Sequence, residues 1–94
     1  MTLDTARLLA TVNHRATRLY EDGYRALWQE EGSTLAVTND EGTTYSVDVI
    51  FETCTCPFWS GHEGRLACKH LLGKDQLLAD QAAFGMRLPE EVAP

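Results

Sequence analysis

Long apolar runs and basic residues are both scarce in this sequence. No stretch approaches the roughly 20 apolar residues that a membrane-spanning helix needs, and Arg7 and Arg15 interrupt the N-terminal segment where a secretory signal would lie. We therefore expect an intracellular, cytoplasmic and soluble protein with no membrane partner. Eight Lys and Arg residues stand against fourteen Asp and Glu residues, giving a net charge of −6. This balance excludes a polycation that coats nucleic acid by charge alone.

Cysteine is also sparse, and its number is odd. The chain has three cysteines, so no disulfide framework can use all of them. In a reducing compartment, clustered cysteines are more typical of metal sites than of disulfides. The sequence also lacks any carboxylate pair, Ser-His-Asp order, phosphate-binding loop or open metal set that would support catalysis. We therefore expect a protein that is not an enzyme.

Length, composition and apolar periodicity together predict one α+β domain that spans residues 1–94. A length of 94 residues with 44% apolar content suits a single domain with a modest core. Residues 3–20 are expected to form an amphipathic helix that ends before Gly23, because apolar side chains recur there at helical spacing. The members of this apolar stripe are Leu8, Leu9, Val12, Ala16 and Leu19.

After residue 23 the spacing of apolar residues changes from the helical period to alternation, which is typical of strands. Residues 24–51 predict a three-stranded antiparallel meander with one buried face. Residues 52–67, which contain one proline and two glycines, are expected to form a loop. A second helix is expected to begin at Leu66 or Lys69 and to end at Gly85. Polar clusters mark the two hairpin turns, at residues 30–33 and 39–42.

The three cysteines and one histidine form the pattern C-x-C, eleven residues, C-x-H. Cys54 and Cys56 point to the same side of an extended chain, whereas Cys68 and His70 converge only if Cys68 lies just before a helix and His70 in its first turn. Three thiolates and one imidazole make a closed, structural zinc set. His62 is an alternative fourth ligand, but the start of the helix fixes His70 beside Cys68. Iron or another thiophilic ion would also suit this set, with zinc the default.

These residues resemble a SWIM-type zinc finger, whose signature is C-x-C, a variable gap and C-x-H. The stretches Cys54–Trp59 and Cys68–Leu72 carry the resemblance, which extends weakly over residues 16–75. It implies a zinc-stapled module of short strands followed by a helix, and binding to DNA or to other proteins. Such modules usually occur inside larger proteins, including chromatin remodellers, transposases and ubiquitin ligases.

Net positive charge is confined to two segments. Residues 1–20 and 53–74 each have a net charge of +2, while residues 21–52 have a net charge of −7. We expect a zinc-stabilised module that binds DNA or another nucleic acid, or that belongs to a nucleic-acid-handling complex, with Phe58 or Trp59 either stacking on a base or packing over the zinc. A protein–protein adaptor or a self-associating module, whose cations are only a solvated helix face, is the alternative. The expected phosphate contacts are Arg7, Arg15, Arg18, Arg65, Lys69 and Lys74.

Overall fold

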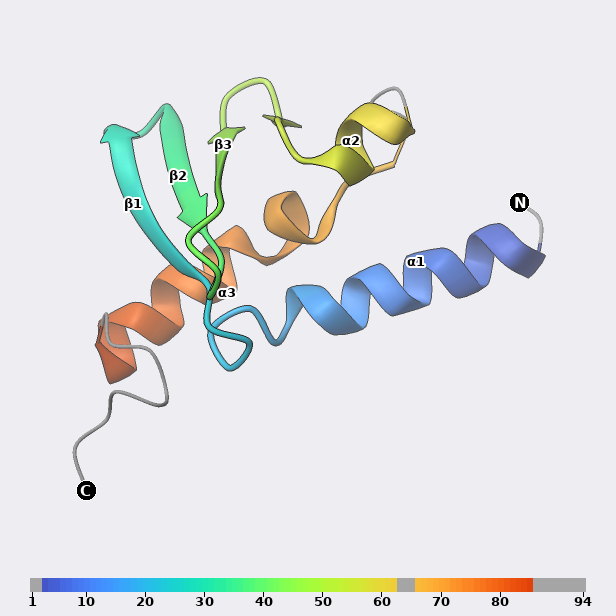
Figure 1. The fold of residues 1–94 in the computed structure, drawn as a ribbon, viewed down its shortest axis with the longest axis horizontal. Coiled ribbons are helices and arrows are strands. Elements are labelled where there is room, and N and C mark those ends of the chain that lie inside the picture. Colours follow the sequence, from blue (N-terminus) through green and yellow to red (C-terminus); the bar gives the residue numbers. More distant parts are fainter. Residues whose placement is uncertain (1–2, 63–65, 86–94) are drawn as a thin grey trace.

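A computed structural model describes residues 3–62 and 66–85 (Figure 1). One of the six expected phosphate contacts, Arg65, lies outside these described residues. The chain forms an α+β domain, as expected. Its elements in chain order are α1 (Leu3–Ala16), β1 (Arg25–Glu30), β2 (Thr34–Thr38), β3 (Thr44–Asp48), β4 (Thr53–Cys54), α2 (Pro57–Gly61) and α3 (Lys69–Phe84).

The strands form one antiparallel sheet in the order β1-β2-β3-β4. The predicted meander is confirmed, and both predicted hairpin turns are present. At each turn a glycine adopts a left-handed conformation, with φ of +77° at Gly32 and +90° at Gly42, which a side chain would disfavour. The alternation on β2 sets the buried face, because Leu35 and Val37 are both fully buried.

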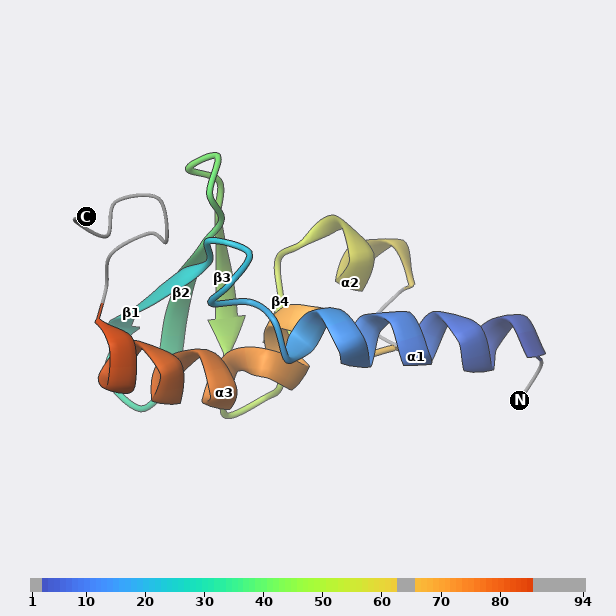
Figure 2. The ribbon, with the colours of Figure 1, turned by 90° about the horizontal axis from the view of Figure 1, so that it is seen from below.

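The second predicted helix covers that face of the sheet. Figure 2 shows α3 lying beneath β1, β2 and β3, and Leu77 of α3 joins the buried cluster of Leu35, Val37 and Val47. Gln81 of α3 also holds the edge of the sheet, since its side-chain amide bonds both the N–H and the carbonyl of Ala26 in β1. These contacts make the sheet and α3 one packed unit.

The first helix is placed differently from an ordinary core helix. Its C-terminal end packs against α3, where Ala16 and Leu19 are buried, and the rest extends away from the sheet (Figures 1 and 2). A Cβ at Gly73 of α3 would overlap the carbonyl oxygen of Ala16, so the crossing requires glycine there. Toward the N-terminus, Leu8 and Leu9 are only half-buried.

Two segments differ from expectation. The first helix ends at Ala16 rather than near residue 20, and residues 17–23 form turns. The segment 52–67 was expected to be a loop throughout, but it contains β4 and α2. A two-residue strand and a five-residue helix are too short to produce a recognisable apolar period. None of the described helices is long and apolar enough to cross a membrane.

Candidate metal centre and the adjoining cavity

The first cysteine pair lies where the β3–β4 hairpin leads into α2. Cys54 pairs with Val47 across the hairpin, and the next residue continues this pairing, because the Thr55 N–H donates to the Ser46 carbonyl oxygen at 3.1 Å. The backbone is therefore extended, and Cys54 and Cys56 are buried while the threonine between them is exposed. This confirms that the i, i+2 spacing directs both thiols to one side.

The second pair lies at the start of α3. Cys68 is the N-cap residue of this helix, with an extended backbone (φ −79°, ψ 169°), and His70 lies in the first turn. The sequence required this placement for the two side chains to converge. The helix continues directly into Leu71 and Leu77, which anchor it in the core.

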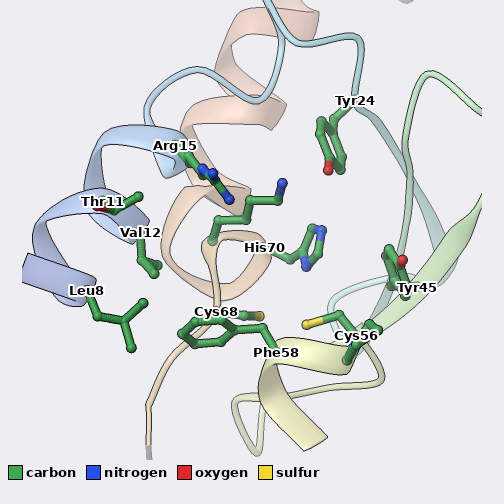
Figure 3. Close-up of a pocket in the computed structure, with 12 residues that line it drawn as sticks. Leu8, Thr11, Val12, Arg15, Tyr24, Tyr45, Cys56, Phe58, Cys68 and His70 are labelled. Carbon is green, nitrogen blue, oxygen red and sulfur yellow. The ribbon is translucent and has the colours of Figure 1, made fainter. Parts of the chain in front are cut away.

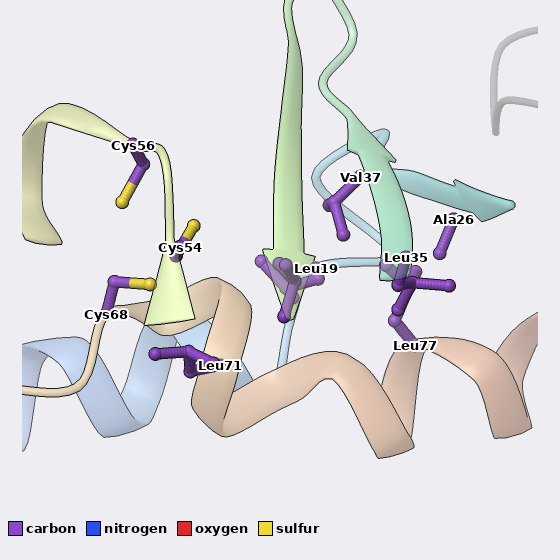
Figure 4. Packing of buried hydrophobic residues seen from close by; sticks show 10 residues of the cluster. Leu19, Ala26, Leu35, Val37, Cys54, Cys56, Cys68, Leu71 and Leu77 are labelled. Atoms are coloured by element: carbon purple, nitrogen blue, oxygen red, sulfur yellow. The ribbon is translucent and has the colours of Figure 1, made fainter. Parts of the chain in front are cut away.

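The four side chains meet at one point. Their ligand atoms all lie within 4.8 Å of one another, and all four residues are buried. The Sγ of Cys54 is 3.8 Å from Nδ1 of His70, and Figure 4 shows the three thiols directed toward one another. The rival ligand His62 is not in the cluster, since its ring packs against Phe58 with centroids 4.5 Å apart.

The pKa values of the three cysteines shift in different directions. A hydrogen bond with Cys68, followed by burial, raises the pKa of Cys54, and burial raises the pKa of Cys56. The hydrogen bond with Cys54 is the main cause that lowers the pKa of Cys68 to about 4. The cluster by itself thus favours one thiolate and two thiols, and a dication supplies the positive charge that lets all three ionise.

Residues 37–73 match the sequence profile of the SWIM zinc finger. This segment is a SWIM zinc finger. It runs from β2 to the first turns of α3, so α1 and most of α3 lie outside it. No curated protein and no solved structure matches the chain significantly.

The residues present fit the zinc that the SWIM family implies. The set is three sulfurs and one imidazole nitrogen, all on buried residues, and this set is typical of zinc. Cys54, Cys56, Cys68 and His70 would hold the ion, which would tie the β3–β4 hairpin to the start of α3. Four protein ligands would leave no open coordination position, so a zinc ion held here would have a structural role.

Two tyrosines enclose the imidazole of the zinc finger. The ring of His70 is 5.5 Å from that of Tyr24 and 5.0 Å from that of Tyr45, centroid to centroid. Its Nδ1 faces the sulfurs, and its Nε2 is buried with no hydrogen-bond partner among the described residues. A metal on Nδ1 leaves the proton on Nε2, which makes Nε2 a buried donor.

A cavity of about 290 Å³ separates α1 from the zinc finger. Figure 3 shows Leu8, Val12 and Arg15 of α1 on one side and Phe58 of α2 facing them, with His70 and the two tyrosines farther along. Arg15 and Lys69 both line it, and none of its described lining residues is acidic. The full lining is Leu8, Thr11, Val12, Arg15, Tyr24, Tyr45, Cys56, Pro57, Phe58, Cys68, Lys69 and His70.

The structure brings together only some of the expected phosphate contacts. Arg15 and Lys69 meet at the cavity, and Arg7 is exposed on the same helix as Arg15. Arg18 forms an ion pair with Glu21 at 3.1 Å. Lys74 lines a different cavity, and its Nζ donates to the Leu71 carbonyl oxygen.

Sequence analysis missed the roles of Tyr24 and Tyr45. Both lie in the segment 24–51, which was predicted only to form strands, yet each contacts His70 and lines the cavity. A period of two says which face a residue occupies, but it does not say what covers that face. Of the two aromatic residues in α2, Phe58 lines the cavity beside α1, whereas Trp59 lines the second cavity, which Lys74 also lines.

Proposed function

We propose that this zinc-binding module binds nucleic acid through the surface formed by α1 and the zinc finger. The single observation that supports it most is the pairing of Arg15 and Lys69 at a cavity whose described lining contains no acidic residue, in a chain with a net charge of −6. Two cations at one concave site whose described lining holds no acid favour an anionic ligand.

The charges of these two cations are not neutralised by nearby described acids. Neither Arg15 nor Lys69 forms an ion pair with any residue in 3–62 or 66–85. Lys69 is held over the Tyr24 ring with its Nζ 4.8 Å from the ring centroid, and an aromatic face leaves its charge available to an anion. Arg7 is also exposed on α1 and adds a further cation to the same helix. With zinc bound, the four-ligand site has a charge of −1, which the two cations outweigh.

Salt-dependent binding tests this function. We expect the zinc-loaded chain to bind short oligonucleotides at low salt, measured by fluorescence anisotropy. Two or three phosphate contacts predict a slope of roughly −1.4 to −2.1 for log affinity against log salt with single strands. Absence of binding at low salt would contradict the proposal.

A matched pair of charge reversals locates the surface. Arg15→Glu should weaken binding strongly, because Arg15 lines the cavity. Lys74→Glu changes the net charge by the same amount, but Lys74 lines the other cavity, so its effect should be small. Equal losses in the two variants would show that only total charge matters and that this surface is not the site.

A protein–protein adaptor is the second candidate, and an exposed apolar group favours it. Phe51, at the tip of the β3–β4 hairpin, is 78% exposed, and Leu72 of α3 is 47% exposed. Leu72 and Trp59 line a cavity of about 260 Å³ with Glu52, the residue after Phe51. This candidate predicts a concentration-dependent oligomer or a co-purifying partner, lost in Phe51→Ser, and a monomer without a partner would count against it.

A further inference from the structure

We infer that the cavity between α1 and the zinc finger accepts an unpaired nucleobase, which would make the module selective for single-stranded nucleic acid. The inference rests on the proposed function, because it names the form of nucleic acid that the same surface binds. It depends on two properties of the cavity: its aromatic and apolar walls, and the cations beside them.

The walls have the chemistry of a base-stacking site. Leu8 and Val12 of α1 face Phe58 of α2 across the cavity (Figure 3), and the rings of Tyr24 and Tyr45 also line it. Stacking of a base on aromatic side chains does not depend on its identity, because every base has a π-face. The volume of about 290 Å³ lies at the lower end of small-molecule sites, which suits one planar ring system better than a folded peptide segment.

The cations suit the phosphates that accompany a base. Arg15 projects from the α1 side and Lys69 from the start of α3, so they flank the cavity from two different elements. A nucleotide brings its ring and its negative charge together, and the cavity offers apolar walls and positive charge together. An acidic peptide supplies the charge but requires no aromatic walls.

The imidazole of His70 adds to the aromatic wall. His70 is only 4% exposed and lines the cavity beside Tyr24 and Tyr45, while its Nε2 is enclosed by protein. The ring therefore offers the base a further surface to pack against rather than a hydrogen-bond partner. A duplex presents its bases stacked and paired, so it could reach this site only by flipping a nucleotide out.

Three ligands of equal length separate this inference from the proposed function. The zinc-loaded chain is titrated with a labelled single-stranded 12-mer, the same 12-mer as a duplex, and a 12-mer of abasic sites that keeps every phosphate. We expect the single strand to bind roughly five- to 150-fold more tightly than the abasic strand, the range given by one stacked base, and more tightly than the duplex. Equal binding of the single and abasic strands, or tighter binding of the duplex, overturns the inference and leaves the proposed function intact. No binding to any of the three rejects both.

Variants that fill the cavity provide the second test. Thr11 is an exposed residue that lines the cavity, so Thr11→Trp should place a bulky ring in the cavity and lower single-strand affinity to that of the abasic strand. Ala10→Trp adds a similar ring to the same helix at an exposed position outside the cavity, and it should bind as the parent chain does. Leu8→Trp repeats the test from a second lining position. Parent-like single-strand affinity in both folded filling variants would overturn the inference.

Discussion

Two regions of this molecule achieve burial by different means. In the sheet and α3, packed apolar side chains form the buried core, with Leu35, Val37, Val47 and Leu77 all fully buried. In the segment from β4 through α2 to the start of α3, no residue of α2 is fully buried, and the three cysteines and His70 are buried together where the three elements meet. A short segment that lacks its own apolar core is usually stabilised by a metal or a disulfide. We therefore expect the two regions to respond differently to perturbation.

Removal of the metal should give the largest difference. Structural zinc contributes about 10–16 kcal/mol of apparent binding energy in small zinc fingers, so a strong chelator or Cys56→Ala should unfold at least the C-terminal half of the chain. Hydrogen exchange should show loss of protection first in β4, α2 and the first turn of α3, and later in β1 and β2. Full thermal stability after complete metal removal would contradict this prediction.

A core truncation should affect the other region first. Leu77 is fully buried between α3 and the sheet, so Leu77→Ala should lower the free energy of unfolding by about 2–5 kcal/mol. Urea denaturation of the zinc-loaded chain measures the loss. Ala82, exposed on the same helix, provides the control, because Ala82→Ser should change stability by less than about 0.5 kcal/mol.

Zinc affinity at the metal centre should depend on pH, whereas the apolar core of the sheet and α3 has no comparable titrating group among the four residues named above. The pKa of Cys54 and that of Cys56 are raised, and that of Cys68 is lowered to about 4. At neutral pH the first two thiols hold protons that zinc must displace, while Cys68 is already ionised. Affinity should therefore fall as pH falls, by about a hundredfold per unit for two displaced protons, which corresponds to about 2.7 kcal/mol. Competition with a chelator between about pH 7 and 8 measures the slope, and a slope near zero would be inconsistent with the raised values.

A smaller effect is expected where α1 joins the core. Gly73→Ala would place a methyl group against the Ala16 carbonyl oxygen and the Leu19 side chain, costing about 1–3 kcal/mol by overpacking, offset in part by the better helix propensity of alanine. Gly61→Ala is the matched control, since a Cβ there meets no described atom within 4 Å. Thermal denaturation compares the two, and equal melting temperatures would show that α1 can shift away at little cost.

Local sequence patterns predicted most of the metal site. The choice of His70 over His62 followed from the start of a helix, and the structure places Cys68 at the N-cap as that argument required. The meander was also predictable, because alternation and turn residues act over a few positions. The helix ends, the short β4 and α2, and the enclosure of His70 by Tyr24 and Tyr45 were not, since each depends on contacts between segments distant in the chain.

The sequence by itself predicted the candidate ligand set and the class of fold, because the C-x-C and C-x-H pairs and the helical and alternating patterns each arise from residues within a few positions of one another. Only the tertiary structure decided that α3 rather than α1 covers the sheet, and that Arg15 and Lys69 meet at one cavity while Lys74 lines another. The physical reason is the close crossing of α1 and α3 at Gly73. The apolar stripe of α1 specifies a buried face, whereas the missing side chain on a helix more than fifty residues later specifies where that face packs.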